Sequence, residues 1–378
     1  MKNNILIHLA LVVFSLVACD VDEYVTASNA DEDRVLSQID FSNPNIKMLY
    51  DEYNMGLLFE YEKALDFAYD AGSVGQVNIW RGIDMPQIQT RFEVDSVLTP
   101  EGKVEYEAYK AEVTTFLVEN LFNYFKPNST IATLMPYKVL VSNSLFSESS
   151  VRDDAGDILT ESEERLSSSA ENNLRTVFNK HSIVFSVDLD QLSTSSRIEE
   201  FTKDNFYILL SRIMGMHNLY DLVPDEFYAG KEDYYGLEMD EPFITETGKE
   251  DYARIDFIEK DWFYEKGFID AKYFYGFSSG LRNFNQYYDQ ETGELFDQSV
   301  TGYRYISHPK ALQDGYDFVA NREEDVRAYI NELIFRDADE LLAFPENIQN
   351  NLKIILGLLT EWGVDILAIN PDLEVLNQ

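Results

Sequence analysis

The chain has a single cysteine, Cys19, among its 378 residues. A lone cysteine excludes an intramolecular disulfide, so the protein must be held together by a packed core. Hydrophobic residues make up 45% of the sequence, which indicates a globular chain. The part that follows Cys19 is long enough for one large domain or for two closely packed lobes.

Basic residues are also few. The chain has 30 Lys and Arg against 68 Asp and Glu, which gives a formal net charge of −38. A field of this sign repels phosphate backbones and anionic headgroups, so we expect no nucleic acid as a partner. The acidity otherwise indicates a solvated surface, and it points only weakly to calcium or cationic ligands. The sequence also lacks a Gly-x-Ser-x-Gly elbow and a glycine-rich phosphate loop, which excludes those catalytic motifs.

The apolar run near the start of the chain, from Ile5 to Ala18, is short. A helix needs about 20 apolar residues to cross a hydrocarbon core of roughly 30 Å, so this run is no membrane anchor. Lys2 precedes the run and Cys19 directly follows it, an order typical of a secretory signal. The junction resembles the lipobox, at which a cysteine is acylated, for example with palmitate. We therefore expect a lipoprotein signal peptide over residues 1–18 and a lipid on Cys19; the alternative is a plain signal peptide with a cysteine nearby by chance.

Residues 19–45 are polar and acidic. Such a stretch buries too little apolar area to order itself, so we expect a flexible tether. Asp20, Asp22 and Glu23 come directly after the cysteine and resemble the surface-export signal of Bacteroidota lipoproteins. In other bacteria, an Asp after the cysteine is associated with retention at the inner membrane. The first interpretation predicts a lipid-anchored protein of the outer membrane, on the cell surface.

Residues 46–192 combine strand and helix patterns, which predicts a mixed α/β lobe. Short apolar runs typical of strands occur at three places: Gly56–Tyr61, Tyr137–Ser142 and Ser182–Val187. Between the first two, aromatic and apolar residues recur at helical spacing from Tyr106 to Leu117. This helix must end before Pro127, because proline cannot continue it.

The acidic stretch Asp153–Glu164 partly resembles the calcium-binding EF-hand loop. Its carboxylates at positions 1, 5 and 12 of a twelve-residue window fit that motif. Ala155 and Ile158 occupy the positions at which the motif needs an oxygen ligand and a glycine turn. The match therefore fails, and we expect an ordinary loop.

Residues 193–378 are richer in helix patterns and predict a mainly helical lobe. We expect a central helix over residues 197–217 that begins with a capping box from Ser196 to Glu199. Its apolar residues keep the spacing of one buried face up to His217. The fold class expected from the whole chain is α+β.

Apolar spacing near the C-terminus predicts two further helices. One covers Val326–Ile334 and the other covers Ile348–Leu359, with Pro345 between them.

An aromatic cluster lies between the helical blocks. Flat aromatic faces stack on sugar rings, which would suit a glycan-binding protein, but aromatic residues this dense also form cores. Its members are Tyr273, Phe274, Tyr275, Phe277, Phe284, Tyr287 and Tyr288.

This order of features resembles the zinc metallopeptidase lipoproteins of Bacteroidota, which are thought to be zincin-like and are often encoded beside outer-membrane nutrient importers. Ile208–Gly215 occupies the place of the family's His-Glu-x-x-His-x-x-His helix. Asn218–Phe227 resembles the loop that follows this helix in the family. Further similar segments are Tyr316–Ala320, Glu324–Val326 and Trp362–Asp365. The resemblance implies a zincin-like fold, with an edge strand above the central helix that pairs with extended peptide.

The family's metal-binding residues are not retained. Its chemistry needs two His one helical turn apart to hold zinc, and a Glu to take a proton from the bound water. Those positions are Ile208, Leu209 and Arg212, and the third ligand position is Gly215. A permanent cation at Arg212 would repel zinc. We therefore expect no zinc cofactor and no catalysis by the family's mechanism.

The chain after Cys19 keeps only three histidines, namely His181, His217 and His308. His217 ends the apolar face of the central helix, where we expect it to be packed or to cap the helix. His308 is expected in an exposed loop. His181 precedes the strand at Ser182–Val187, which we expect to form one wall of a cleft over the central helix. The candidate cleft residues are therefore Arg212, His217 and His181.

These features predict a non-catalytic, surface-tethered binding or accessory protein that captures peptide or glycan for nutrient import. Three alternatives stay open. The first is a peptidase or other hydrolase whose zinc site is rebuilt from the scattered histidines and carboxylates. The second is a glycan-binding lipoprotein, and the third is a structural subunit of an outer-membrane importer complex.

Overall fold

The computed structural model describes residues 33–67, 83–152, 158–165, 176–178, 182–235, 258–259, 264–269, 272–274, 281–283, 304–305 and 321–377. The expected signal peptide and Cys19 lie outside these residues. Met1–Gln38 and Ile39–Gln378 are separate compact units. Within the first unit, helix α2 spans Arg34–Gln38, inside the range expected to be a flexible tether. The second unit holds every site discussed below, and it crosses the expected boundary between lobes at residue 193.

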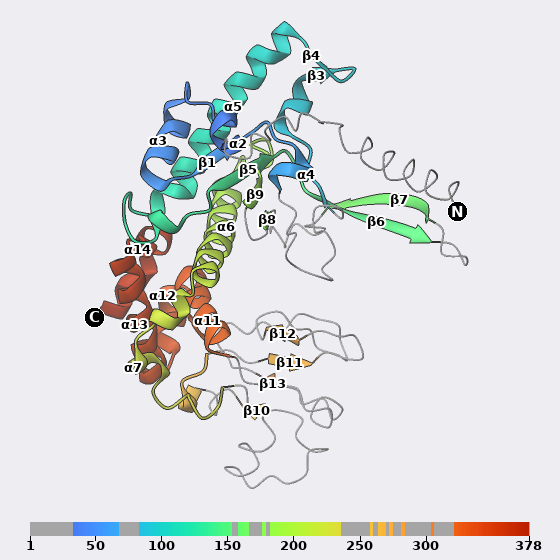
Figure 1. Ribbon diagram of the computed structural model, residues 1–378. Helices are drawn as coiled ribbons and strands as arrows, with labels where there is room; N and C mark the ends of the chain where they lie inside the picture. Colours follow the sequence, from blue (N-terminus) through green and yellow to red (C-terminus); the bar gives the residue numbers. More distant parts are fainter. Residues whose placement is uncertain are drawn as a thin grey trace, which may run out of the picture. The chain divides into compact units, whose positions relative to one another are not determined.

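The main sheet joins strands that are far apart in the sequence. Its order is β1-β5-β9-β8. Strands β1 (Gly56–Leu58), β5 (Lys138–Ser142) and β9 (Ser182–Ser186) run parallel, and β8 (Thr176–Phe178) pairs antiparallel with β9 (Figure 1). Every residue of β9 is buried, as expected for a parallel strand covered on both faces. All three predicted strands are confirmed. Strand β9 lies between β5 and β8, so among the described strands it is not the peptide-pairing edge strand that the resemblance implies.

The helices of the first half begin at side-chain caps. Helix α3 (Pro44–Tyr53) starts two residues before the boundary at residue 46 that was expected between the tether and the mixed lobe. Its N-cap is Asn43, whose side chain accepts from the backbone amides of Asn45 and Ile46. Helix α5 (Pro100–Asn120) confirms the helix predicted before Pro127. Shorter helical segments connect these elements: α4 (Lys63–Asp66), η2 (Ile88–Phe92), η3 (Phe122–Tyr124) and η4 (Ala132–Leu134).

The predicted central helix is α6 (Ser195–Met216). It begins two residues before the expected start at 197, because Thr194 is the N-cap and its side chain accepts from the amide of Arg197. The expected capping box at Ser196 is therefore wrong. The predicted apolar face is buried, and it includes Phe206, Leu209, Leu210, Ile213 and Met214. In Figure 1, α6 extends from the main sheet toward the C-terminal helices.

The C-terminal helices confirm the two that were predicted and add a short one. They are α11 (Arg322–Phe335), α12 (Ala338–Ala343), α13 (Glu346–Trp362) and α14 (Ile366–Ile369). Helix α12 was not expected; it starts at a capping box between Asp337 and Glu340. Helix α11 packs against both α6 and α13, so it links the central helix to the end of the chain. The other helical segments are η5 (Leu219–Leu222), α7 (Asp225–Tyr228) and η8 (Pro371–Asn377).

The acidic stretch predicted as a loop is partly a strand. Strand β7 (Ile158–Arg165) pairs antiparallel with β6 (Phe146–Arg152), and β2 (Ile83–Asp84) pairs with β6. Strands pair through hydrogen bonds between their backbones, so a stretch rich in acidic residues can also form a strand. The remaining strands form small two-stranded pairs: β3 (Glu93–Val94) with β4 (Val97–Leu98), β10 (Ile258–Glu259) with β13 (Arg304–Tyr305), and β11 (Lys272–Phe274) with β12 (Leu281–Asn283).

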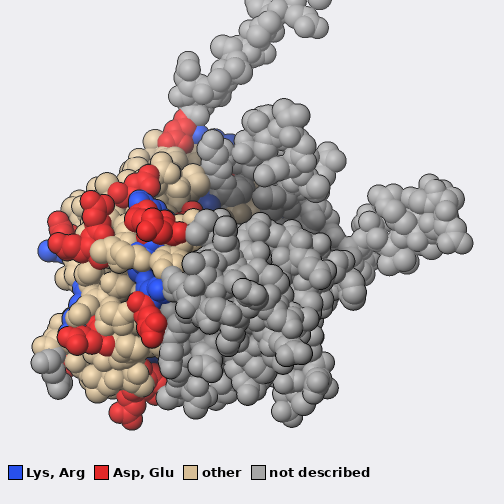
Figure 2. Space-filling model, turned by 90° about the horizontal axis from the view of Figure 1, so that it is seen from below, with Lys and Arg blue, Asp and Glu red and all other residues tan. Residues whose placement is uncertain are grey.

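The mixture of helices and small sheets makes the fold α+β, as predicted. Among the described helices, none combines the length and the apolar character that a bilayer crossing needs. On the face drawn in Figure 2, acidic side chains spread over much of the described surface, with basic side chains between them. This distribution agrees with a solvated acidic surface.

Candidate functional site

A pocket of about 280 Å³ lies at the carboxyl end of α6. One wall comes from the segment that leads from η4 into β5, and the other comes from the last turns of α6. The volume lies near the lower end of the range for small-molecule sites, roughly 300–1,000 Å³, and suits a group of about one or two side chains. The lining residues are Leu134, Met135, Pro136, Tyr137, Arg212, Ile213, Met216 and His217.

Arg212 is the charged residue of this pocket, and it is buried, with 8% of its surface exposed. Its guanidinium carbon lies 4.9 Å from the ring centre of Phe178 on the edge strand β8. Its Nε is buried without a hydrogen-bond partner, and among the described residues no carboxylate forms an ion pair with it. Burial lowers the pKa of Arg212 to about 10, so the side chain still carries its charge at pH 7.

A buried cation without a counter-charge is costly. The desolvation penalty of an ion in a protein interior is several kcal/mol, and it is normally offset by an opposite charge. The contact with the Phe178 ring contributes about 0.5–2 kcal/mol, and a ring face does not use the in-plane N–H donors of the guanidinium. Among the described residues, the charge of Arg212 is therefore not neutralised, and its Nε donor is unused.

His217 lines the same pocket as Arg212, as the C-cap residue of α6. Its backbone amide donates to the carbonyls of Ile213 and Gly215, and its side chain is exposed. His217 was expected to be packed or to cap the helix. It caps the helix, and its side chain is not packed. The other predicted cleft residue, His181, lies outside the described residues, as does His308. The wall expected from Ser182–Val187 is formed instead by Leu134 to Tyr137.

Within the described ranges, no group of three or more His, Cys, Asp or Glu side chains is placed to hold a metal ion. The positions that would carry the family's zinc ligands are apolar or cationic, and Leu209 is fully buried in the core. The donor set at the end of α6 thus does not fit zinc.

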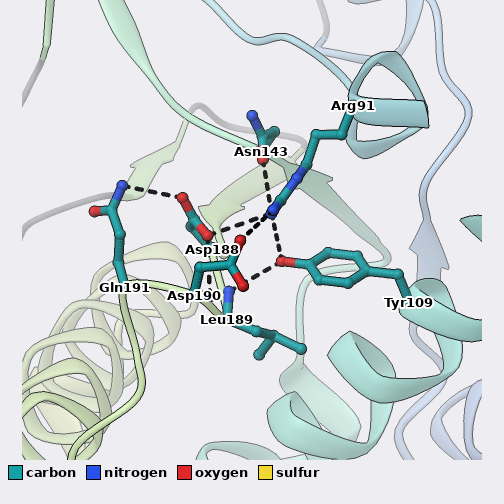
Figure 3. Close-up of polar contacts among 7 residues, drawn as sticks. All are labelled: Arg91, Tyr109, Asn143, Asp188, Leu189, Asp190 and Gln191. Carbon is teal, nitrogen blue, oxygen red and sulfur yellow. Dashed lines mark hydrogen bonds and ion pairs between the residues drawn. The ribbon is translucent and has the colours of Figure 1, made fainter. Parts of the chain in front are cut away.

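A polar cluster that the sequence did not predict lies beyond the carboxyl ends of β5 and β9 (Figure 3). Arg91 donates to the hydroxyl of Tyr109 at 2.6 Å and to Asn143 at 3.4 Å. It forms ion pairs with Asp188 at 3.3 Å and with Asp190 at 2.5 Å. Burial alone would lower the pKa of Arg91, but the hydrogen bond to Asp190 and the neighbouring carboxylates raise it on balance.

This edge of a parallel sheet is a usual place for ligands. Here the protein's own side chains occupy it, and they tie η2 to the segment between β9 and α6. We therefore assign the Arg91 cluster a structural role. Asn143 and Asp188 follow their strands closely, which is the sequence signal that could have indicated a polar edge.

A buried ion pair between Lys231 and Asp325 was also not predicted. Lys231 is fully buried, and its Nζ lies 2.8 Å from Oδ2 of Asp325 and 3.6 Å from the ring centre of Phe227. The hydroxyl of Tyr235 donates to the same carboxylate at 2.5 Å. Burial lowers the pKa of Lys231 and raises the pKa of Asp325. The pair anchors the segment after α7 to α11.

Most of the aromatic cluster proposed for glycan binding lies outside the described residues. Tyr273 and Phe274 are in β11, and the other five members are not described. Glycan binding thus stays a sequence-based prediction.

Comparison of the chain with protein-family models, with curated proteins and with solved structures found no match.

Proposed function

We propose that the protein is a lipid-anchored, non-catalytic binding protein that captures extended peptide at the cell surface. The observation that carries this proposal is Arg212, a buried cation without a counter-charge among the described residues, in a pocket beside an edge strand. A buried cation of this kind attracts an anionic group of a ligand.

The edge strand supports the choice of peptide. Strand β8 ends the sheet order, and no other described strand pairs with its outer edge. An extended peptide can add to such an edge through backbone hydrogen bonds, which need no metal. Phe178 of β8 is 46% exposed, and its ring contacts Arg212, which lines the pocket.

The strand order also supports a zincin-like arrangement. The antiparallel edge strand β8 comes directly before the last parallel strand, β9, and α6 follows β9. The contact between Phe178 and Arg212 also supports it, because Arg212 is at the position that would carry a zinc ligand in the resembling family. A guanidinium in place of the metal would keep the peptide-binding surface and remove the catalytic centre.

The location of the protein is part of the same proposal. A lipid on Cys19 would anchor the chain in the outer membrane, next to an importer that takes up the captured peptide. Replacing Cys19→Ser should abolish labelling with radioactive palmitate and release the protein from the membrane fraction. Labelling that persists in the variant would contradict the lipid anchor.

The proposal is tested by titrating the mature protein with a set of capped and uncapped short peptides in a calorimeter. We expect saturable binding without cleavage of the peptide, and Phe178→Ala should weaken it. Phe41→Ala is the matched control, because Phe41 is 40% exposed and remote in sequence from the pocket. Cleavage of the peptides together with one zinc ion bound per chain would overturn the proposal, as would the absence of any peptide binding.

A further inference from the structure

The group that the pocket recognises can be named, on the basis of the proposed peptide-binding function. We infer that the pocket beside Arg212 binds a free carboxylate attached to a short aliphatic group, as at the C-terminus of a peptide that ends in an aliphatic residue.

The guanidinium supplies the recognition of the carboxylate. The planar fork of an Arg side chain matches a carboxylate with two parallel N–H donors, one of which can be Nε–H. In this structure Nε of Arg212 is buried and has no hydrogen-bond partner among the described residues. A carboxylate bound in the pocket would neutralise the buried charge of Arg212.

The walls of the pocket supply the recognition of the aliphatic group. Leu134, Met135 and Ile213 present apolar side chains, and Met216 lies at the rim with 40% of its surface exposed. Apolar walls favour an aliphatic carboxylate over phosphate or sulfate, whose other oxygens would lose water without gaining partners. The volume of about 280 Å³ restricts the aliphatic group to about one side chain.

The partial charge at the end of α6 opposes anion binding but does not decide the outcome. The carbonyl groups at a helix C-terminus carry about half a negative charge, and this charge acts within the last turn. Arg212 carries a full positive charge in a position with little exposure to water, where electrostatic attraction is stronger than at the surface. The positive charge of the guanidinium therefore outweighs the partial negative charge at the end of α6.

The experiment compares an acetylated dipeptide that ends in leucine, as the free acid and as the C-terminal amide, by calorimetric titration of the mature protein. We expect the acid to bind about tenfold more tightly than the amide, or better. Arg212→Met should remove this preference, and Arg212→Lys should restore only part of it, because Lys keeps the charge but lacks the fork. Arg197→Met, which removes the same charge from the exposed start of α6, should leave the preference unchanged.

A second variant tests the pocket without changing its charge. Met216→Trp places a larger side chain at the exposed rim and should weaken binding of the acid about tenfold by filling the mouth. Thermal unfolding of each variant checks that it folds.

The outcomes separate the inference from the proposed function. If the acid and the amide bind equally well, or if Arg212→Met keeps the preference, the carboxylate inference is overturned while peptide capture stands. Equal binding of inorganic phosphate also overturns it. If 4-methylpentanoate binds as tightly as the peptide acid, the pocket takes small carboxylic acids and peptide capture is overturned. If no peptide form binds, both fail.

Discussion

Lys231 and Arg212 are both buried cations, and their surroundings differ. Lys231 has a carboxylate partner at 2.8 Å and lies over the rings of Phe227 and Tyr329. Arg212 has a ring contact and no ion-pair partner among the described residues. The comparison teaches that burial of a charge does not by itself define its role. A paired charge holds two segments together, whereas an uncompensated charge costs stability, which is the observation behind the proposed ligand site at Arg212.

The largest effect is expected at the paired site. Asp325→Asn leaves Lys231 buried without an opposite charge, so we expect the free energy of unfolding to fall by about 3–5 kcal/mol. Denaturant unfolding measures this change. Glu323→Gln, at a half-exposed position of the same helix, should change it by less than about 1 kcal/mol. A loss no larger than that control would show that the pair is not what anchors the segment after α7.

The next effect concerns Asp204 on α6, a partly buried acid. Desolvation, followed by the charge of Glu200, raises its pKa from 3.8 to about 6. Because the folded state holds the proton more tightly than the unfolded state, stability is highest below pH 4 and declines as the pH rises to about 6. The loss is up to about 3 kcal/mol.

Asp204→Asn should therefore be more stable than the unchanged protein at pH 7, and the difference should vanish near pH 3. Unfolding curves at several pH values measure both. A variant that is less stable at pH 7 would contradict the shift.

At Arg212 we expect a smaller change in the free energy of unfolding, and its sign is opposite to that of the change at Asp325. Replacing Arg212→Met removes a desolvated cation and keeps the apolar stem, so we expect the free energy of unfolding to rise by about 1 kcal/mol. Arg197→Met should leave it unchanged. Destabilisation of Arg212→Met by more than about 1 kcal/mol would show that the guanidinium is compensated and structural.

The smallest effect is expected from salt. The net charge of −38 repels an anionic ligand over long distances, and added salt screens this repulsion more than it screens the buried contact with Arg212. Affinity for the peptide acid should therefore hold or rise by a few-fold between about 20 and 300 mM salt. A tenfold loss would indicate an exposed ion pair as the binding contact.

Periodicity predicted the elements that bury a regular face. Helix α6 and helix α13 were found because their apolar residues recur at helical spacing, and β5 and β9 because they are continuous apolar runs. Helix α12 was missed because six residues are too few for a period, although its capping box was visible. The β6–β7 pair was missed because charged and hydroxyl side chains give no strand pattern.

The polar sites could not be predicted because their members are far apart in the sequence. Lys231 and Asp325 are separated by 94 residues, and Arg91 and Asp188 by 97. Arg212 was predicted to line a cleft, because it replaces a metal ligand of the resembling family. Its opposite wall, the segment from Leu134 to Tyr137, has no sequence feature that points to α6.

The most direct test of the account follows the Nε–H of Arg212 itself in a ¹H–¹⁵N NMR spectrum of the mature protein. The resonance is assigned by its absence in Arg212→Lys. We predict that it shifts on titration with the peptide acid and saturates with the same affinity as in the calorimeter, and that the amide leaves it in place. A resonance that the acid does not move, under conditions in which the acid binds, would contradict the claim that Arg212 is the ligand-binding group.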